Sequence, residues 1–241
     1  MSPTVESPLS PVDFDLTSLN QQFEGRHPRE ILAWAVAHLP TGLVQTSAFN
    51  VDDMVITDIL YRELQAPVPV IFLETLHHFA ESLTFVAEAK QTYNLNLKTY
   101  QIPEVNSREA FADRYGAALW ETDIEKFHYL TKIEPLERGL QELNTSAWIT
   151  GRRRDQAVTR QNMPYLELDK LGRLKINPLA AWTRKDSWAY AAEHGMIYNP
   201  LHDQGYASIG DEPLTTPVGE GEDERAGRWR GSGKTECGIH I

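Results

Sequence analysis

The chain has 241 residues, of which 41% are apolar, and its formal net charge is −11. This composition allows a substantial apolar core, and the acidic balance argues against a general attraction to nucleic acid or anionic membranes. No stretch approaches the roughly 20 apolar residues that cross a bilayer, and the acidic, Pro- and Ser-rich first residues are unlike a secretory signal. We therefore expect a cytoplasmic protein that binds neither nucleic acid nor membranes.

Cys237 is the only cysteine of the chain. One thiol cannot form an internal disulfide, and it cannot supply the several thiolates of a zinc or iron–sulfur site. A reducing compartment and the absence of a bound metal are the simplest expectations.

The predicted elements follow from apolar periodicity and from breaker residues. Residues 1–15 are expected to be disordered, since Pro, Ser and acidic residues dominate there. Helical spacing predicts helices over 28–39, 50–64, 79–93 and 183–195, and a mostly helical segment over 107–143 with a kink or restart at Pro135. Short β-branched runs predict strands over 42–49, 68–74, 95–102 and 147–151, and a possible hairpin over 166–178.

Strands and helices that alternate in this way predict an α/β fold, with a mostly parallel sheet covered by helices on both faces. No linker divides the chain, so we expect one nucleotide-binding domain over 16–219 and a C-terminal tail over 220–241. Ligands bind such sheets outside the carboxyl ends of the strands. The loops "TSAFN", "LETLHHF" and "TGRRRDQ" should therefore meet in one site.

These three loops carry groups that bind anions. "TSAFNVDD" follows a strand and opens a helix, where hydroxyls and backbone N–H groups can hold a phosphate, although an ordinary capped turn is the alternative. Thr75 and His78 are expected to cap an element or hydrogen-bond to a ligand rather than bind a metal. The arginines after "TG" match phosphate geometry, with a solvated loop as the alternative. The predicted contacts are Thr46, Ser47, Ala48, Phe49, Thr75, His78, Gly151, Arg152, Arg153 and Gln156.

The tail is rich in glycine and cations. Nearby positive charge lowers a thiol pKa from its ordinary value of about 8.5, and glycines permit the segment to fold over a site. We predict a mobile tail that carries Cys237 as a nucleophile and contacts the ligand through Arg228, Arg230 and Lys234. These cations are expected to find partners only when an anionic nucleotide binds. The alternative is a disordered terminus with an incidental thiol.

Eight motifs carry a resemblance to a known family, from about residue 28 to the end. They are "TSAFN", "FLETLHHF", "KIEPL", "ITGRRRDQ", "INPLAAWT", "GYASIGD", "EGEDERAGRW" and "KTECGIH". Together they resemble phosphoadenylyl-sulfate (PAPS) reductases of the thioredoxin-dependent form, and fungal sequences most.

The resemblance implies an adenine nucleotide α-hydrolase-like fold and the assimilatory reduction of PAPS to sulfite and adenosine 3′,5′-bisphosphate. It implies that Cys237 attacks the sulfonate sulfur and forms a thiosulfonate. The chain has no second thiol to release the sulfite, so reduced thioredoxin or glutaredoxin must do so. A homodimer without an iron–sulfur cluster is also implied by the family.

Three alternatives remain at this stage. The adenylyl-sulfate reductases of the same family carry a four-cysteine iron–sulfur cluster, for which this chain lacks the cysteines. An ATP pyrophosphatase of the same fold would need an "SGGxDS"-like loop, from which "TSAFNVDD" departs. A catalytically dead nucleotide-binding protein is the third alternative, and Cys237 with the basic loops argues against it.

Overall fold

The core of the computed structural model, which describes residues 14–230, 234, 236, 238 and 239, is a six-stranded sheet. The order of the strands is β3-β2-β1-β4-β6-β5. The strands are β1 (Leu43–Thr46), β2 (Val70–Glu74), β3 (Leu97–Gln101), β4 (Ala147–Ile149), β5 (Leu166–Leu168) and β6 (Leu174–Ile176). Every neighbouring pair is parallel except β5 and β6, which form the predicted hairpin. The predicted fold class is confirmed, and residues 1–13 of the predicted disordered N-terminus lie outside the described residues.

The helices follow the predicted order with one addition at the start. They are α1 (Leu16–Phe23), α2 (Pro28–His38), α3 (Val51–Asp58), α4 (Ala80–Tyr93), α5 (Arg108–Tyr115), α6 (Leu119–Thr122), α7 (Ile124–His128), α8 (Glu134–Glu142) and α9 (Arg184–His194). π-Helical turns, η2 (Ile59–Glu63) and η3 (Tyr129–Ile133), follow α3 and α7, and 3₁₀ turns are η4 (Arg154–Gln156), η5 (Val158–Arg160), η6 (Pro200–Gln204) and η7 (Glu212–Leu214). The expected restart occurs at Pro135, which stands in the first turn of α8.

Helix α1 was not predicted. Its start is capped by Asp15, whose side chain accepts from the Ser18 N–H at 3.1 Å. Its middle is tied to β5, because Asn20 donates to the Leu166 carbonyl and accepts from the Leu166 N–H, both at 2.9 Å. The contact that fixes this helix therefore comes from a segment almost 150 residues away.

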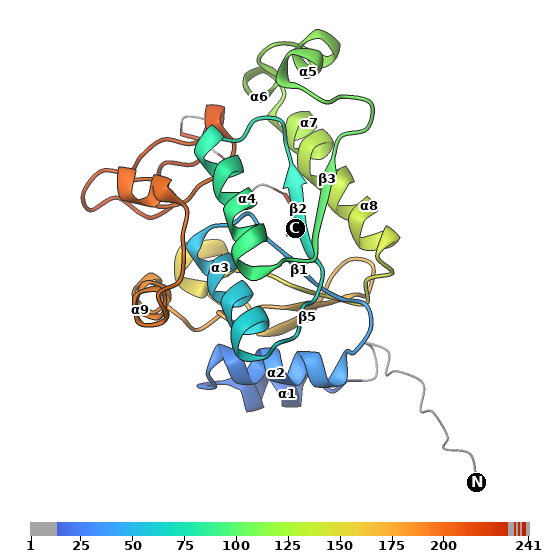
Figure 1. Ribbon diagram of the computed structural model, residues 1–241, viewed down its shortest axis with the longest axis vertical. Helices are drawn as coiled ribbons and strands as arrows, with labels where there is room; N and C mark the ends of the chain where they lie inside the picture. The colour runs from blue at the N-terminus through green and yellow to red at the C-terminus, as the bar shows by residue number, and fades with distance from the viewer. Residues whose placement is uncertain (1–13, 231–233, 235, 237, 240–241) are drawn as a thin grey trace.

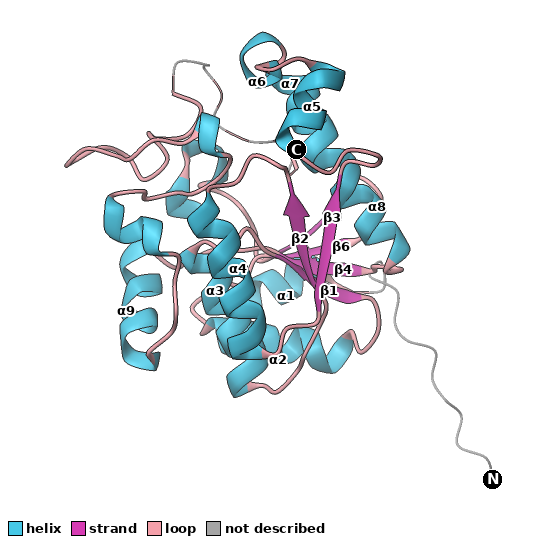
Figure 2. Ribbon diagram, turned by 45° about the horizontal axis from the view of Figure 1, so that its top comes forward, coloured by secondary structure: helices cyan, strands magenta, loops and turns pink. Residues whose placement is uncertain are grey.

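Helices cover both faces of the sheet (Figures 1 and 2). Helices α2, α3, α4 and α9 contribute to the main apolar core on one face. Helix α8 covers the other face, where Leu136 and Leu140 pack against Val44, Ile71 and Trp148. Side chains alternate along a strand, so successive residues of β1 point to opposite faces of the sheet and contribute to different apolar clusters. A smaller apolar cluster lies under α5, α6 and α7, which gather at one end of the molecule (Figure 1).

The parallel arrangement brings the loops after β1, β2 and β4 to one edge of the sheet. Gln45 in β1 is level with Val70 in β2 and with Ile149 in β4. The segment 207–211 lies against the same edge, because the Asn50 side chain donates to the Ile209 carbonyl at 3.0 Å and accepts from its N–H at 2.8 Å. Asn50 is also the N-cap residue of α3, so it joins the start of this helix to segment 207–211.

The helices of the described residues include none that is long and apolar enough to span a membrane.

Candidate active site

A cavity lies at the carboxyl ends of β1, β2 and β4, where the predicted loops meet. Its wall combines the loop after each of these strands with segment 207–211 and part of the tail. Nine of the predicted ligand contacts line it, namely Thr46, Ser47, Ala48, Thr75, His78, Gly151, Arg152, Gln156 and Arg228. The topology therefore brings together groups that the sequence places more than 180 residues apart.

Phe49 and Arg153 are predicted contacts that do not line the cavity. The Phe49 ring is buried and packs edge-on against Phe72, with a centroid distance of 5.6 Å. Arg153 is 0% exposed, and its guanidinium pairs with carboxylates on three sides. The backbone at Arg153 is extended, which turns Arg152 and Arg153 to opposite sides.

Arg230 and Lys234 also lie away from the cavity wall. The Arg230 guanidinium pairs with Glu222 at 2.9 Å, and the Lys234 ammonium pairs with Glu125 at 2.5 Å. The expectation that these cations find partners only in the presence of a nucleotide was therefore wrong, because the protein itself supplies carboxylates. Cys237 lies outside the described residues.

Seven charged residues line the cavity that were not predicted as contacts: Asp52, Asp53, Lys132, Arg160, Asp211, Glu224 and Arg225. Four of them, Lys132, Asp211, Glu224 and Arg225, fall inside the motifs "KIEPL", "GYASIGD" and "EGEDERAGRW", so the resemblance alone was a signal for them. Arg160 comes at the end of η5 and belongs to the basic segment "GRRRDQAVTR", but its spacing did not single it out as a contact.

Lys132 and Asp211 form a buried ion pair in the cavity wall. Burial alone would raise the pKa of Asp211, but the Lys132 ammonium outweighs it and holds this pKa well below its usual range. The pair joins the π-helical turn η3 to segment 207–211. On the adjacent turn, burial and the Lys132 cation lower the pKa of His128 to about 3, so this imidazole is neutral and accepts from the Trp229 indole N–H at 3.3 Å.

Asp53 and Gly151 show how closely β4 approaches the start of α3. The Asp53 carboxylate accepts from the Ala48 N–H at 2.9 Å and so holds the loop after β1. Burial raises the pKa of Asp53 to about 7. A Cβ atom at position 151 would stand 2.3 Å from Asp53 Oδ1, so only glycine fits there.

Arg152 is oriented by the protein before any ligand is present. Its guanidinium donates to the Asn177 side-chain oxygen at 2.9 Å and to Thr150 Oγ1 at 3.2 Å, and it pairs with Glu167. A guanidinium has five N–H donors, so it retains capacity for an anionic ligand. Arg228 is fixed in a similar way, over the Trp229 ring at 4.6 Å and at 3.1 Å from the Ile209 carbonyl.

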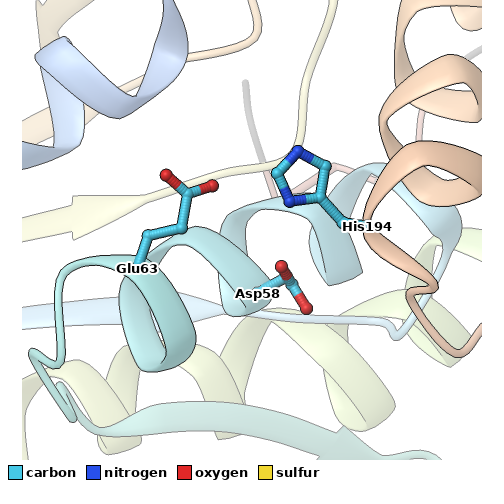
Figure 3. A group of neighbouring side chains, drawn as sticks. All are labelled: Asp58, Glu63 and His194. Carbon is cyan, nitrogen blue, oxygen red and sulfur yellow. The ribbon is translucent and has the colours of Figure 1, made fainter.

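A second group of polar side chains, Asp58, Glu63 and His194, lies outside this cavity (Figure 3). Three such residues are a possible ligand set for a metal ion. However, the carboxylates already have partners in the protein, since the Tyr190 hydroxyl shares its one proton between Asp58 at 2.9 Å and Glu63 at 2.7 Å. Tyr93 donates to the second Asp58 oxygen at 2.8 Å. We therefore interpret this group as a contact between α3, η2, α4 and α9.

Comparison with known proteins places the cavity in a family context. Residues 42–217 match the family model described as phosphoadenosine phosphosulfate reductase domain. The phosphoadenosine phosphosulfate reductase of Emericella nidulans is 44% identical over 230 residues, which are 93% of this chain and 74% of the relative. An adenosine 5′-phosphosulfate reductase of Anoxybacillus flavithermus is 39% identical over 211 residues, 87% of this chain and 88% of the relative.

The fold is similar to that of a solved relative. The crystal structure of PAPS reductase from Candida auris, in a phosphate complex, has a TM-score of 0.77 and 35% identity. The match covers 90% of this chain and 99% of that one.

Proposed function

The chain belongs to the phosphoadenosine phosphosulfate reductase family, and we propose that it reduces PAPS to sulfite and adenosine 3′,5′-bisphosphate. The observation that carries the proposal is the cationic wall of the cavity, which lies where this fold binds nucleotides. The cations of the wall are Lys132, Arg152, Arg160, Arg225 and Arg228. Such groups bind the anionic substrate and stabilise the charge that develops on the leaving phosphate.

The first chemical step is nucleophilic attack by the Cys237 thiolate on the sulfonate sulfur of PAPS. The new S–S bond forms as the bond between sulfur and the bridging phosphate oxygen breaks, and both electrons of that bond leave with the phosphate. The products of this step are adenosine 3′,5′-bisphosphate and a Cys237 thiosulfonate. Support comes from Glu236 and Ile239, which flank this cysteine in sequence and lie at the cavity.

An external dithiol completes the reaction. Its thiolate attacks the Cys237 sulfur of the thiosulfonate and releases sulfite, and its second thiol then closes a disulfide and frees Cys237. The dithiol is oxidised by two electrons and the sulfonate sulfur is reduced by two. Thioredoxin or glutaredoxin is the proposed donor, because this chain has only one cysteine. We further propose that the enzyme acts as a homodimer in the cytoplasm, where thiols remain reduced.

We propose PAPS rather than adenylyl sulfate as the substrate, although relatives named for each nucleotide match this chain. The resemblance gives adenylyl-sulfate reductases a four-cysteine iron–sulfur cluster, and one cysteine cannot supply it.

Intact mass spectrometry tests the proposal directly. The purified protein is mixed with PAPS in the absence of any reductant, and a gain of one SO₃ group per chain is expected. The Cys237→Ser variant should bind adenosine 3′,5′-bisphosphate in calorimetry but gain no mass. Reduced thioredoxin should then release sulfite from the modified wild type. A wild-type chain that binds PAPS but gains no mass would contradict the proposal and indicate a nucleotide-binding protein without this chemistry.

A further inference from the structure

Glu236 forms the most extensive set of ionic contacts between the described part of the tail and the cavity wall. The Arg160 guanidinium donates side-on to both of its carboxylate oxygens, from Nε at 2.7 Å and from a terminal nitrogen at 2.6 Å. Arg225 adds a longer contact of 3.4 Å, and the Thr159 hydroxyl donates at 3.3 Å. Four contacts thus converge on one carboxylate.

The pair is well ordered by its surroundings. The Arg160 side chain is 8% exposed and that of Glu236 is 13% exposed. The remaining terminal nitrogen of Arg160 donates to the Gln156 side-chain oxygen at 2.5 Å, so the guanidinium has a fixed orientation. Bidentate charge-assisted pairs of this kind are strong and geometrically specific. Burial opposes the charge on Glu236, but the Arg160 and Arg225 cations outweigh it and lower its pKa, so the carboxylate is ionised at neutral pH.

Ile239 supplies a second, apolar anchor on the other side of position 237. Its side chain lines the cavity and packs against the cluster of Val44, Ile71, Leu136, Leu140 and Trp148 under α8. Gly238 between the anchors has a φ of +87°, which favours glycine, and a Cβ there would stand 3.3 Å from Ile133 Cδ1. Glu236 is thus held by ion pairs and Ile239 by apolar packing, and the two residues contact different elements.

We propose that Glu236 is a positioning residue, which acts through Arg160 and Arg225 to hold the reactive segment against the cavity. This inference rests on the proposed function, in which Cys237 is the nucleophile. In this proposal Glu236 acts through its protein partners and not by contact with the reacting atoms. Its role is to fix the residue before the nucleophile, because a small displacement of a reacting group costs a large part of the rate.

The alkylation rate of Cys237, measured as a function of pH, separates a positioning role of Glu236 from an effect of its charge on the thiol pKa. The rate constant for iodoacetamide is measured across a pH range for the wild type, Glu236→Gln and Glu236→Asp, with intact mass as the readout. The Asp variant keeps the charge but is one methylene too short to reach both guanidinium groups. If Glu236 anchors the segment, the limiting alkylation rate at high pH rises several-fold in both variants. The midpoint of the pH profile, which reports the pKa of Cys237, shifts only in the Gln variant.

Single-turnover kinetics provide the second measurement. With saturating PAPS and no reductant, both Glu236 variants should form the thiosulfonate about 10- to 100-fold more slowly, while their affinity for adenosine 3′,5′-bisphosphate is unchanged. Glu222→Gln is the matched control, because Glu222 pairs with Arg230 on the surface and both measurements should match the wild type. Thermal melting confirms that each variant is folded.

The outcomes are distinguishable. Limiting alkylation rates equal to the wild type in both Glu236 variants would overturn the positioning role, as would a loss of nucleotide affinity that accounts for the whole rate effect. A wild type that forms no thiosulfonate would contradict the proposed function, while the alkylation comparison would still test the anchor.

Discussion

Replacing Arg153 with methionine tests the buried ion network beside the cavity. The Arg153 guanidinium contacts Asp52 at 2.9 Å, Glu224 at 2.5 Å and Asp155 at 3.1 Å. The Asp155 side chain is 37% exposed, so water compensates for most of its loss. Asp52 and Glu224 are much less exposed, and methionine leaves both carboxylates without their cation.

The expected loss of unfolding free energy is large because Asp52 and Glu224 remain buried. Removing one partner of a buried pair costs about 3 to 5 kcal/mol, which for a chain of this size lowers the Tm by about 6 to 20 °C. The control is Arg26→Met, whose exposed pair with Glu30 should contribute about 1 kcal/mol or less. Differential scanning calorimetry at pH 8 measures both changes.

The loss should also depend on pH. Burial raises the pKa of Asp52 to about 6, and Arg153 is the main group that opposes this rise. In the variant the pKa of Asp52 rises further. A carboxyl with a raised folded-state pKa contributes stability at low pH that is lost as pH rises from its unfolded value of about 3.9 through its folded value. The Tm difference from the wild type should therefore be larger at pH 8 than at pH 5. A difference below 2 °C at pH 8, or one independent of pH, would refute the reasoning.

Three further predictions concern the cavity. Gly151→Ala should cost about 1 to 3 kcal/mol in urea unfolding, because its Cβ would meet Asp53; an unchanged midpoint would contradict the close approach. Arg152→Ala should weaken adenosine 3′,5′-bisphosphate binding by about 10- to 150-fold in calorimetry, the loss of a charge-assisted hydrogen bond, and equal affinity would exclude Arg152 from the site. PAPS should be turned over much faster than adenylyl sulfate in a sulfite-release assay, and equal rates would remove the proposed preference.

The sequence was sufficient for the sheet and for most of the helices. Apolar runs and breakers are local properties, and they located every strand of the described sheet. Helix α1 was missed because its decisive contact, Asn20 with Leu166, is made only in the folded chain. The Asp15 cap is a local signal for its start, but that contact does not show where the helix packs.

The candidate site was predicted less completely, for a similar reason. Arg152 and Arg153 are adjacent and chemically identical in the sequence, yet only Arg152 lines the cavity. The difference is made by Asp52 and Glu224, which come from distant segments and surround Arg153. Residue type and strand position indicated where cations gather, but the partner carboxylates decide which of them line the cavity.

The composition of the cavity wall also determines when the cavity can form during synthesis on the ribosome. Its residues are drawn from Thr46 at one extreme to Ile239 at the other, whereas the last strand of the sheet ends at Ile176. A nascent chain can thus complete its sheet while the proposed nucleotide site still lacks the segment that begins at Ala207. Ligands stabilise only states that bind them. Nucleotide should therefore protect the finished chain from cellular proteases and leave any fragment that stops before Ala207 unprotected.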